Sequence, residues 1–233
     1  MSIKIGVHDF FAYTIPGMAY LLVFAIQAHI FGLTTFDLSI LDLSLGLILG
    51  VTLIAYLVGQ LLDTVSSNVL PRIYDPKEGK GTNHDHALQN LRNDYGNRLT
   101  ANVQLRDWPV LYMYVKQRNE NVTERIDGFN AQSIMLRNVS FALLLLAIGL
   151  LFHQLVVLSF EYFLFSIASF VFSAVAFRRA RRVGRWFYSS IYQAAIAYSL
   201  DVSTFMNLLP ADSSESRDAD LSPPITTTTP HRV

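Results

Sequence analysis

The residues best suited to metal chemistry are two histidines that flank an aspartate, His84-Asp85-His86. A metal site needs three or four ligands, and no partner set with a recognisable spacing is nearby. The chain has no cysteine, which excludes disulfides, thiolate metal sites and cysteine nucleophiles. Walker loops, dinucleotide fingerprints, nucleophile elbows and H-E-x-x-H motifs are also missing. We therefore expect no metal and no cofactor, and we favour a protein that is not an enzyme.

Arginines are the second group that could do chemistry, here the binding of phosphate. Five of them directly follow an apolar stretch, where they act as a topology signal and meet anionic headgroups, at roughly 1 kcal/mol each. A cationic pocket for a nucleotide-like ligand, formed with arginines of the central segment, is a further possibility. The formal net charge is zero, so we expect no direct nucleic-acid binding. The candidates are Arg106, Arg118, Arg125, Arg178, Arg179, Arg181, Arg182 and Arg185.

Other polar side chains lie within or beside apolar stretches, where such groups often mark a function. Asp63 and Arg137 fall at corresponding ends of their stretches, so they either pair at one membrane depth or remain two solvated charges. Another set falls near the expected outer ends, where it either meets interfacial water or lines a pore or ligand cavity. This set is Gln27, His29, His153 and Gln154.

The elements that must position these residues are long apolar segments. The chain of 233 residues is 52% apolar and 15% charged, and a helix needs about 20 apolar residues to cross a bilayer. Four segments qualify: one at about Phe10 to Gly32, one at about Leu41 to Leu62, and two that share 138–177. The turn between the last two falls at His153-Gln154 or at Ser159-Phe160-Glu161, and we prefer the second because it contains the only acidic residue of the stretch.

The basic residues orient these segments. Lysines and arginines total 18, and none lies between Asp9 and Asn68 or between Asn138 and Phe177. The positive-inside rule therefore places both termini and the central segment in the cytoplasm. We expect a multi-pass protein of a cell membrane, namely a bacterial inner membrane.

The predicted fold class is an all-α integral membrane protein with four transmembrane helices in two hairpins. A helical cytoplasmic region separates the hairpins, and a further helix follows the fourth span. The expected divisions are a first hairpin at 1–63, a cytoplasmic segment at 64–136, a second hairpin at 137–177, a basic cluster with an amphipathic helix at 178–209, and a disordered tail at 210–233.

Two cytoplasmic faces are too apolar to remain alone in water. One belongs to a helix that begins near Trp108, and the other is a stripe from Trp186 to Tyr198. Docking of the two would bury both faces in one small domain and would bring Arg106, Arg118 and Arg185 to a common surface. The alternative is that the second helix lies flat in the headgroup layer.

Small residues offer contacts between helices. In the second span Gly46, Gly50, Ala55 and Gly59 recur at helical spacing, which lets backbones approach closely. The contact is either within one chain or between subunits of a homo-oligomer. In the first span, Pro16-Gly17 predicts a short interfacial helix, then a kink, then the span.

The opening Asp9-Phe10-Phe11-Ala12-Tyr13-Thr14-Ile15-Pro16-Gly17 resembles that of uncharacterised bacterial four-span membrane proteins. These begin with an acidic residue, aromatics and a Pro-Gly pair before the first span. The resemblance implies a cytoplasmic segment between two helical hairpins, and it implies no activity.

The functional hypothesis is a non-enzymatic membrane protein whose cytoplasmic region senses a partner protein or ligand and acts through the membrane part. Membrane effectors of bacterial defence or nucleotide signalling share this general layout. The alternatives are an oligomeric channel or transporter component and a membrane-anchored scaffold. In each case the partners include the lipid bilayer and a second copy of the chain.

Topology reporters test this arrangement. Fusions at the N-terminus, Thr100 and Glu215 should report the cytoplasm, and fusions at Phe36 and Glu161 the opposite side. An outward signal at Thr100 would contradict four spans.

Overall fold

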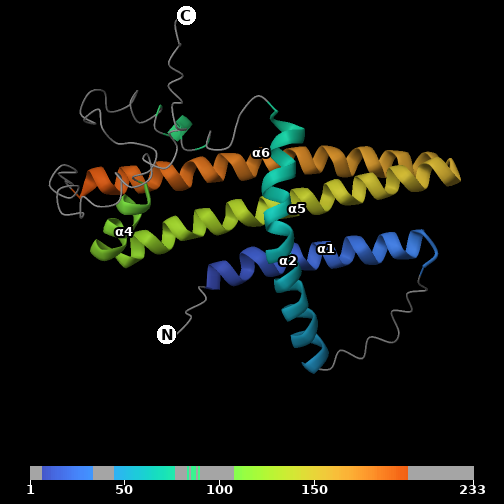
Figure 1. The fold of residues 1–233 in the computed structure, drawn as a ribbon, viewed down its shortest axis with the longest axis horizontal. Helices are drawn as coiled ribbons and strands as arrows, with labels where there is room; N and C mark the ends of the chain where they lie inside the picture. Colours follow the sequence, from blue (N-terminus) through green and yellow to red (C-terminus); the bar gives the residue numbers. More distant parts are fainter. Residues whose placement is uncertain are drawn as a thin grey trace, which may run out of the picture. The chain divides into compact units, whose positions relative to one another are not determined.

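The computed structural model describes residues 7–33, 45–76, 83, 85–87, 89 and 108–198, apart from the side chains of Asp9 and Ile196. These residues are 94% helical, and they contain no strand (Figure 1). The chain divides into two units, Met1–Ala194 and Ala195–Val233, and the packing described below lies within the first. The helices are α1 (Val7–Ile30), α2 (Leu45–Tyr74), α4 (Trp108–Arg118), α5 (Glu120–Val157) and α6 (Phe160–Ala197).

Four of these helices, α1, α2, α5 and α6, are long and apolar enough to cross a membrane. They overlap the four segments expected from the sequence, and α2, α5 and α6 extend beyond them. Large apolar side chains such as Leu53 and Phe165 are more than 60% exposed on them, as a lipid environment requires. α5 and α6 have 38 residues each, or about 57 Å at the helical rise. They are therefore longer than the roughly 30 Å of a hydrocarbon core.

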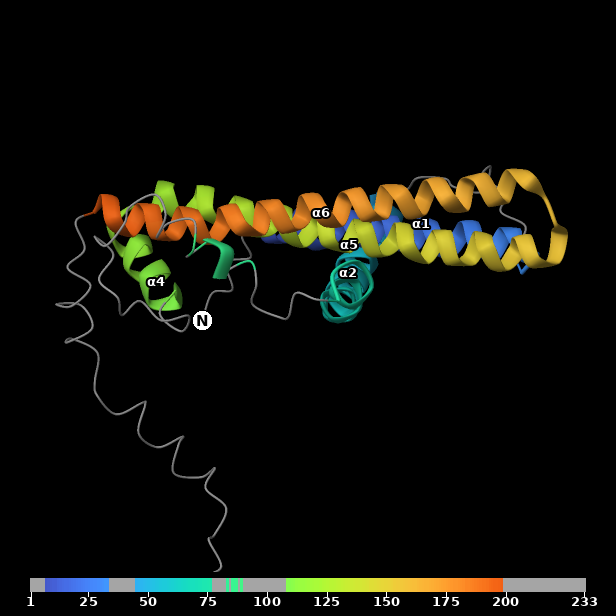
Figure 2. The ribbon, with the colours of Figure 1, turned by 90° about the horizontal axis from the view of Figure 1, so that it is seen from above.

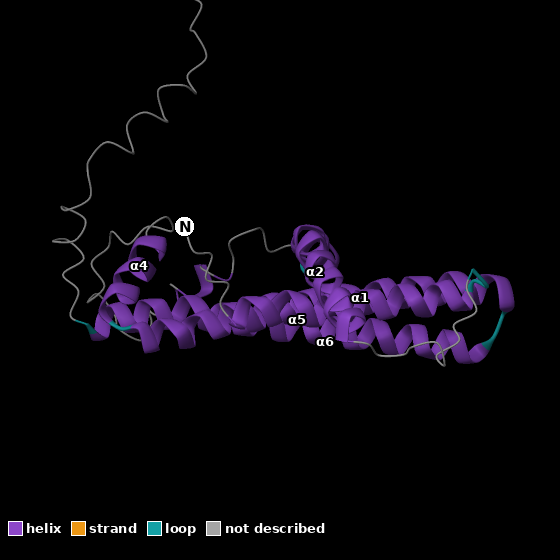
Figure 3. Ribbon diagram, turned by 90° about the horizontal axis from the view of Figure 1, so that it is seen from below, coloured by secondary structure: helices purple, strands orange, loops and turns teal. Residues whose placement is uncertain are grey.

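A tight turn joins α5 to α6. α5 ends at Val157, Leu158 has left-handed backbone angles (φ 51°), and α6 begins at Phe160. The Leu158 N–H donates to the Gln154 carbonyl at 2.9 Å and closes the helix end. The preferred turn at Ser159 is thereby confirmed, and Figure 3 shows the short loop that joins the two helices. The other candidate, His153-Gln154, lies inside α5.

α5 and α6 run side by side in opposite directions (Figures 1 and 2). Serines at intervals of seven residues join them. Ser133 Oγ donates to the Ala180 carbonyl at 3.0 Å, and Ser166 Oγ to the Ala147 carbonyl at 2.8 Å. Midway, the Ser140 and Ser173 hydroxyls donate to each other's carbonyls at 2.8 and 2.7 Å. A step of seven residues is two helical turns, so this serine ladder keeps to one seam.

α1 and α2 meet at small residues. A side chain on Gly17 would strike the Ala55 carbonyl, and one on Gly59 would strike the Tyr13 carbonyl. Ala55 and Gly59 therefore serve contact within the chain, as one alternative predicted. Gly46 and Gly50 have nothing within 4 Å of where a Cβ would be, and α2 crosses the other helices instead of following them (Figures 1 and 2). A side-by-side hairpin of α1 and α2 is not confirmed.

α1 is one helix from Val7 to Ile30 with Pro16 inside it. The expected separate interfacial helix is therefore absent: the chain enters the apolar segment without a break. Pro16 is fully buried, and Gly17 provides the close approach to α2. The kink at this pair stays a prediction.

The helices also continue through the expected domain divisions. α2 passes residue 63 and ends at Tyr74, α5 passes 136, and α6 passes 177. The helix expected after the fourth span is thus the extension of α6 itself. The rest of the expected central segment, apart from the positions given above, and the tail at 210–233 lie outside the described residues.

Aromatic residues of the two predicted apolar faces are in contact, while the small cytoplasmic domain expected from their docking stays a prediction. The Trp108 ring of α4 contacts the rings of Phe187 and Tyr188 on α6, at centroid distances of 5.9 and 5.6 Å. Val115 and Ile191 are fully buried. We call this region, which comprises α4, α5 before Arg137 and α6 after Phe177, the basic end.

The main core joins α1, α2, α5 and α6. Tyr20 lies edge-on to Phe141 at 6.2 Å. The buried members are Tyr20, Val23, Leu70, Phe141, Ala142, Leu144 and Phe177.

The α1–α2 contact makes a measurable prediction. Gly59→Leu should lower the free energy of unfolding by about 1–3 kcal/mol, because its side chain meets the Tyr13 backbone, which has no room to move. Gly50→Leu, in open space on the same helix, is the matched control and should leave stability nearly unchanged. Unfolding in detergent micelles measures both, and equal effects would contradict the contact.

Candidate functional site

An ion pair lies at the centre of the candidate site. Arg137 Nη2 of α5 donates to Asp63 Oδ1 of α2 at 2.7 Å. The Asn138 amide donates to the same oxygen at 2.8 Å, and Ser66 Oγ donates to the Asn138 Oδ1 at 2.5 Å. These four residues, here called the polar core, tie α2 to α5. Of the two alternatives for Asp63 and Arg137, the structure has the ion pair and not two separate solvated charges.

The burial of the polar core makes it energetically important. Ser66 and Asn138 are fully buried, while the side chains of Asp63 and Arg137 are 21% and 26% exposed. Low local dielectric strengthens each hydrogen bond, and it also raises the cost of removing one partner. Because the arginine keeps its charge, it neutralises the carboxylate. The arrangement therefore suits holding α2 against α5 better than binding a cation.

Two buried polar atoms near the polar core have no hydrogen-bond partner among the described residues: the Tyr20 hydroxyl and Arg137 Nε. An unsatisfied buried group costs about 1–3 kcal/mol. The polar core is thus only partly satisfied in this arrangement of the helices.

A hollow of about 540 Å³ opens beside the polar core. Asp63 forms part of its wall, so the carboxylate can be approached from one side while Arg137 contacts it from another. Its lining is Tyr13, Leu57, Gln60, Leu61, Asp63 and Thr64.

The end of α2 is fixed to α6 as well. The Tyr74 hydroxyl donates to Ser173 Oγ at 2.9 Å, which joins α2 to the serine ladder. The next residue of the chain, Asp75, forms an ion pair with Arg181. The second half of α2 is therefore held by both long helices.

The sequence interpretation missed several of these residues. Asn138, Ser66, Ser140 and Ser173 had no assigned role, because single serines and asparagines in an apolar stretch are common. A signal was available in the repeat of serine after seven residues, at 133 and 140 and again at 166 and 173. Two such intervals in neighbouring helices indicate one polar seam.

Two of the four polar residues expected at the outer ends, Gln27 and His153, contact other helices. Gln27 Nε2 of α1 donates to the Leu145 carbonyl of α5 at 2.8 Å, and Gly149 leaves room for its side chain. His153 lies edge-on to Tyr162 at 4.7 Å. His29 is exposed, and Gln154 Oε1 is buried without a partner in the described chain. Gln27 also lines an apolar hollow of about 470 Å³.

The candidate arginines that the structure describes do not gather in one pocket. Arg181 is paired with Asp75, and the Arg179 guanidinium lies 5.1 Å from the Trp186 ring centre. On α4, the Arg118 guanidinium lies 5.5 Å from the Tyr114 ring centre. Arg106 lies outside the described residues. The others are exposed or half-buried at separate positions: Arg125, Arg178, Arg182 and Arg185.

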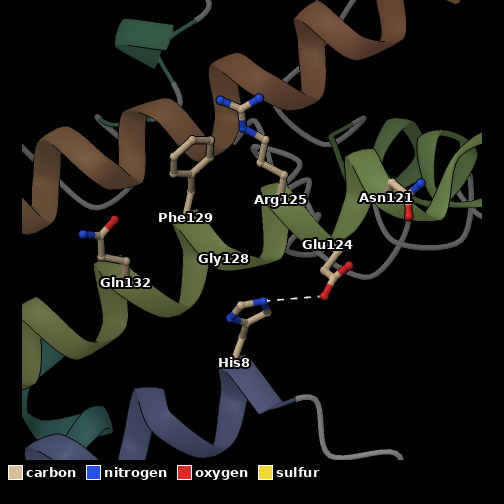
Figure 4. A pocket seen from close by; sticks show the side chains of 7 residues that line it. All are labelled: His8, Asn121, Glu124, Arg125, Gly128, Phe129 and Gln132. Atoms are coloured by element: carbon tan, nitrogen blue, oxygen red, sulfur yellow. Dashed lines mark ion pairs between the residues drawn. The ribbon is translucent and has the colours of Figure 1, made fainter.

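One arginine borders a hollow of about 440 Å³ between the start of α1 and α5 (Figure 4). His8 Nε2 lies 3.9 Å from Glu124 Oε1 there, an ion pair only when the histidine is protonated. Figure 4 shows the Arg125 guanidinium and the Phe129 ring turned away from His8. The lining is His8, Asn121, Glu124, Arg125, Gly128, Phe129 and Gln132.

Metal binding finds no support in the part of the chain that is described. No three histidine, aspartate or glutamate side chains converge there. Of the histidine cluster, Asp85 is exposed and His86 half-buried, while His84 lies outside the described residues.

Comparison with protein-family models, curated proteins and solved structures gave no match. The resemblance of the opening residues therefore stays a prediction.

A double-mutant cycle tests the polar core. Asp63→Asn and Arg137→Gln should each lower the free energy of unfolding by about 1–3 kcal/mol. Their effects should deviate from additivity by about 0.5–3 kcal/mol, because the two groups are in contact. Asp63→Asn combined with Arg118→Gln, on the distant α4, should be additive. Additivity in both pairs would show that the ion pair does not form in the folded protein.

Proposed function

We propose that the chain is a non-enzymatic multi-pass membrane protein that receives a signal at its basic end and transmits it along α5 and α6 into the membrane. The signal is the binding of a cytoplasmic partner protein or an anionic ligand. The response is a change in how α2 and α1 pack on α5. A membrane effector in bacterial defence or signalling is one setting in which such a device would serve.

The continuity of α5 and α6 carries this proposal. Each is a single helix that begins or ends among the aromatic contacts of the basic end and extends into the exposed apolar part. The serine ladder joins the two helices over much of that length. A displacement at Trp108 or Phe187 can therefore pass along these two helices to Arg137 and Asn138 of the polar core, which belong to α5.

The proposed topology has four spans, with the basic end and both termini in the cytoplasm of a bacterial cell. Its support is the charge distribution together with the four apolar helices. Only the apolar lengths of α5 and α6 would lie in the bilayer, and the rest of each helix would project from it.

An oligomeric channel or transporter component is the second candidate. The first turns of α2 favour it, since every residue from Leu45 to Gly50 is exposed. If this face contacts a second copy, Gly50→Leu should reduce cross-linked oligomer without affecting membrane insertion. A membrane-anchored scaffold would not need to pass a signal from the basic end to α2. The distance measurement described next therefore distinguishes a scaffold from the proposed signalling role.

If a change at the basic end alters the packing of α2 on α5, the distance between labels on these two helices should change. Spin labels at cysteines replacing Leu49 on α2 and Leu155 on α5, both exposed, report how these helices sit. Trp108→Ala removes the contacts with Phe187 and Tyr188 and should shift or broaden the distance distribution. Met113→Ala, at an exposed position of the same helix, is the control and should not.

An unchanged distribution in Trp108→Ala would contradict transmission and would favour a scaffold. A shift that persists when Ser140 and Ser173 are both changed to alanine would assign the route to contacts other than the serine ladder.

A further inference from the structure

The arginines that follow the apolar part of α6 differ in what they already contact. Arg181 forms an ion pair with Asp75. Arg178, Arg179 and Arg182 are exposed, and within the described ranges no carboxylate lies at ion-pair distance from them. Three guanidinium groups are therefore available to an external anion.

If α6 crosses a membrane, Arg179 and Arg182 lie at the same depth in the headgroup layer as Trp186. The apolar run of α6 ends at Phe177, and Arg182 lies about 7 Å further along the axis. A headgroup layer is about 5–8 Å thick on each side of the hydrocarbon core. Trp186 is one turn beyond, but helical side chains lean toward the N-terminus and so toward the apolar run. The Arg179 guanidinium reaches the same level, 5.1 Å from the Trp186 ring centre.

The aromatic contacts restrain this group of side chains. Trp186 is 41% exposed, and its ring packs edge-on against Phe129 of α5 at 6.1 Å. Arg179 is attracted to the face of the same ring. A guanidinium held in this way loses less side-chain entropy when it binds a phosphate through two parallel hydrogen bonds.

We propose that Arg179, Arg182 and Trp186 form a binding site for the phosphate of an anionic phospholipid headgroup, with Arg178 adding charge beside it. The inference rests on the proposed placement of α6 in a membrane. The three side chains lie on the convex surface of one helix, which a bilayer can cover from outside. Tryptophan and arginine are also the residue types enriched at this depth.

The test uses the full chain in lipid nanodiscs. Trp108→Phe makes Trp186 the only tryptophan and keeps an aromatic ring against Phe187. Brominated phosphatidylglycerol should quench Trp186 fluorescence more than brominated phosphatidylcholine at equal mole fraction. In the same background, Arg179→Gln and Arg182→Gln should each lower this preference about fivefold, the ratio that roughly 1 kcal/mol per basic residue implies.

The matched control removes two arginines elsewhere, Arg72→Gln with Arg118→Gln, both exposed. In this control variant, brominated phosphatidylglycerol should still quench Trp186 more than brominated phosphatidylcholine does. Equal quenching by the two lipids would overturn the site, and so would an equal loss of preference in the control, which would indicate general charge attraction.

Free phosphate is the other source of the same chemistry. Inorganic phosphate added to nanodiscs of phosphatidylcholine alone should not change the Trp186 emission. If it does, and if it also abolishes the preference for phosphatidylglycerol, the lipid assignment is overturned.

A second measurement avoids the tryptophan substitution. In native mass spectrometry the unaltered chain should retain bound phosphatidylglycerol, and the double variant Arg179→Gln with Arg182→Gln should lose it.

The quenching experiment also separates the site from the membrane placement. Strong quenching by both brominated lipids without preference would leave the membrane placement standing and reject the site. No quenching by either lipid would reject the placement itself.

Discussion

Hydrogen bonding between helices in apolar surroundings is the constraint on which this structure depends. Apolar side chains gain little by leaving lipid for a helix interface, so association relies on close packing and on polar contacts. The chain uses both. Glycines bring α1 against α2, serines join α5 to α6, and the polar core fixes α2 to α5. The glycine contacts are close packing of backbones, whereas the serines donate to carbonyls of the facing helix and the polar core pairs the Asp63 carboxylate with Arg137.

The number of apolar helices could be predicted from sequence because hydrophobic length is a local property. The turn at Ser159 was also predictable, since an acidic residue is costly away from the apolar ends. The pairing of Asp63 with Arg137 could be stated only as an alternative, because residues 74 apart in sequence give no sign of which neighbours they meet. The contact of Trp108 with α6 was predictable because an apolar face exposed to water needs a partner that covers it.

Other features depend on three-dimensional packing and lay beyond the sequence. The small residues of α2 looked like one stripe, yet Ala55 and Gly59 meet α1 while Gly46 and Gly50 stand clear. The crossing of the helices separates the two pairs, and spacing alone does not reveal a crossing. Likewise, Arg181 could not be distinguished from its basic neighbours until Asp75 was found beside it.

The serine ladder limits the ways in which α5 and α6 can move. Its rungs recur every seven residues, so sliding one helix past the other by a single residue would break every rung together. The next matching register lies about 10 Å away. Longitudinal slip is thus blocked at small amplitudes, and the pair is free chiefly to rotate, bend or tilt as a unit. The two helices should therefore move together, and any tilt of the pair would change how it packs where α2 crosses it.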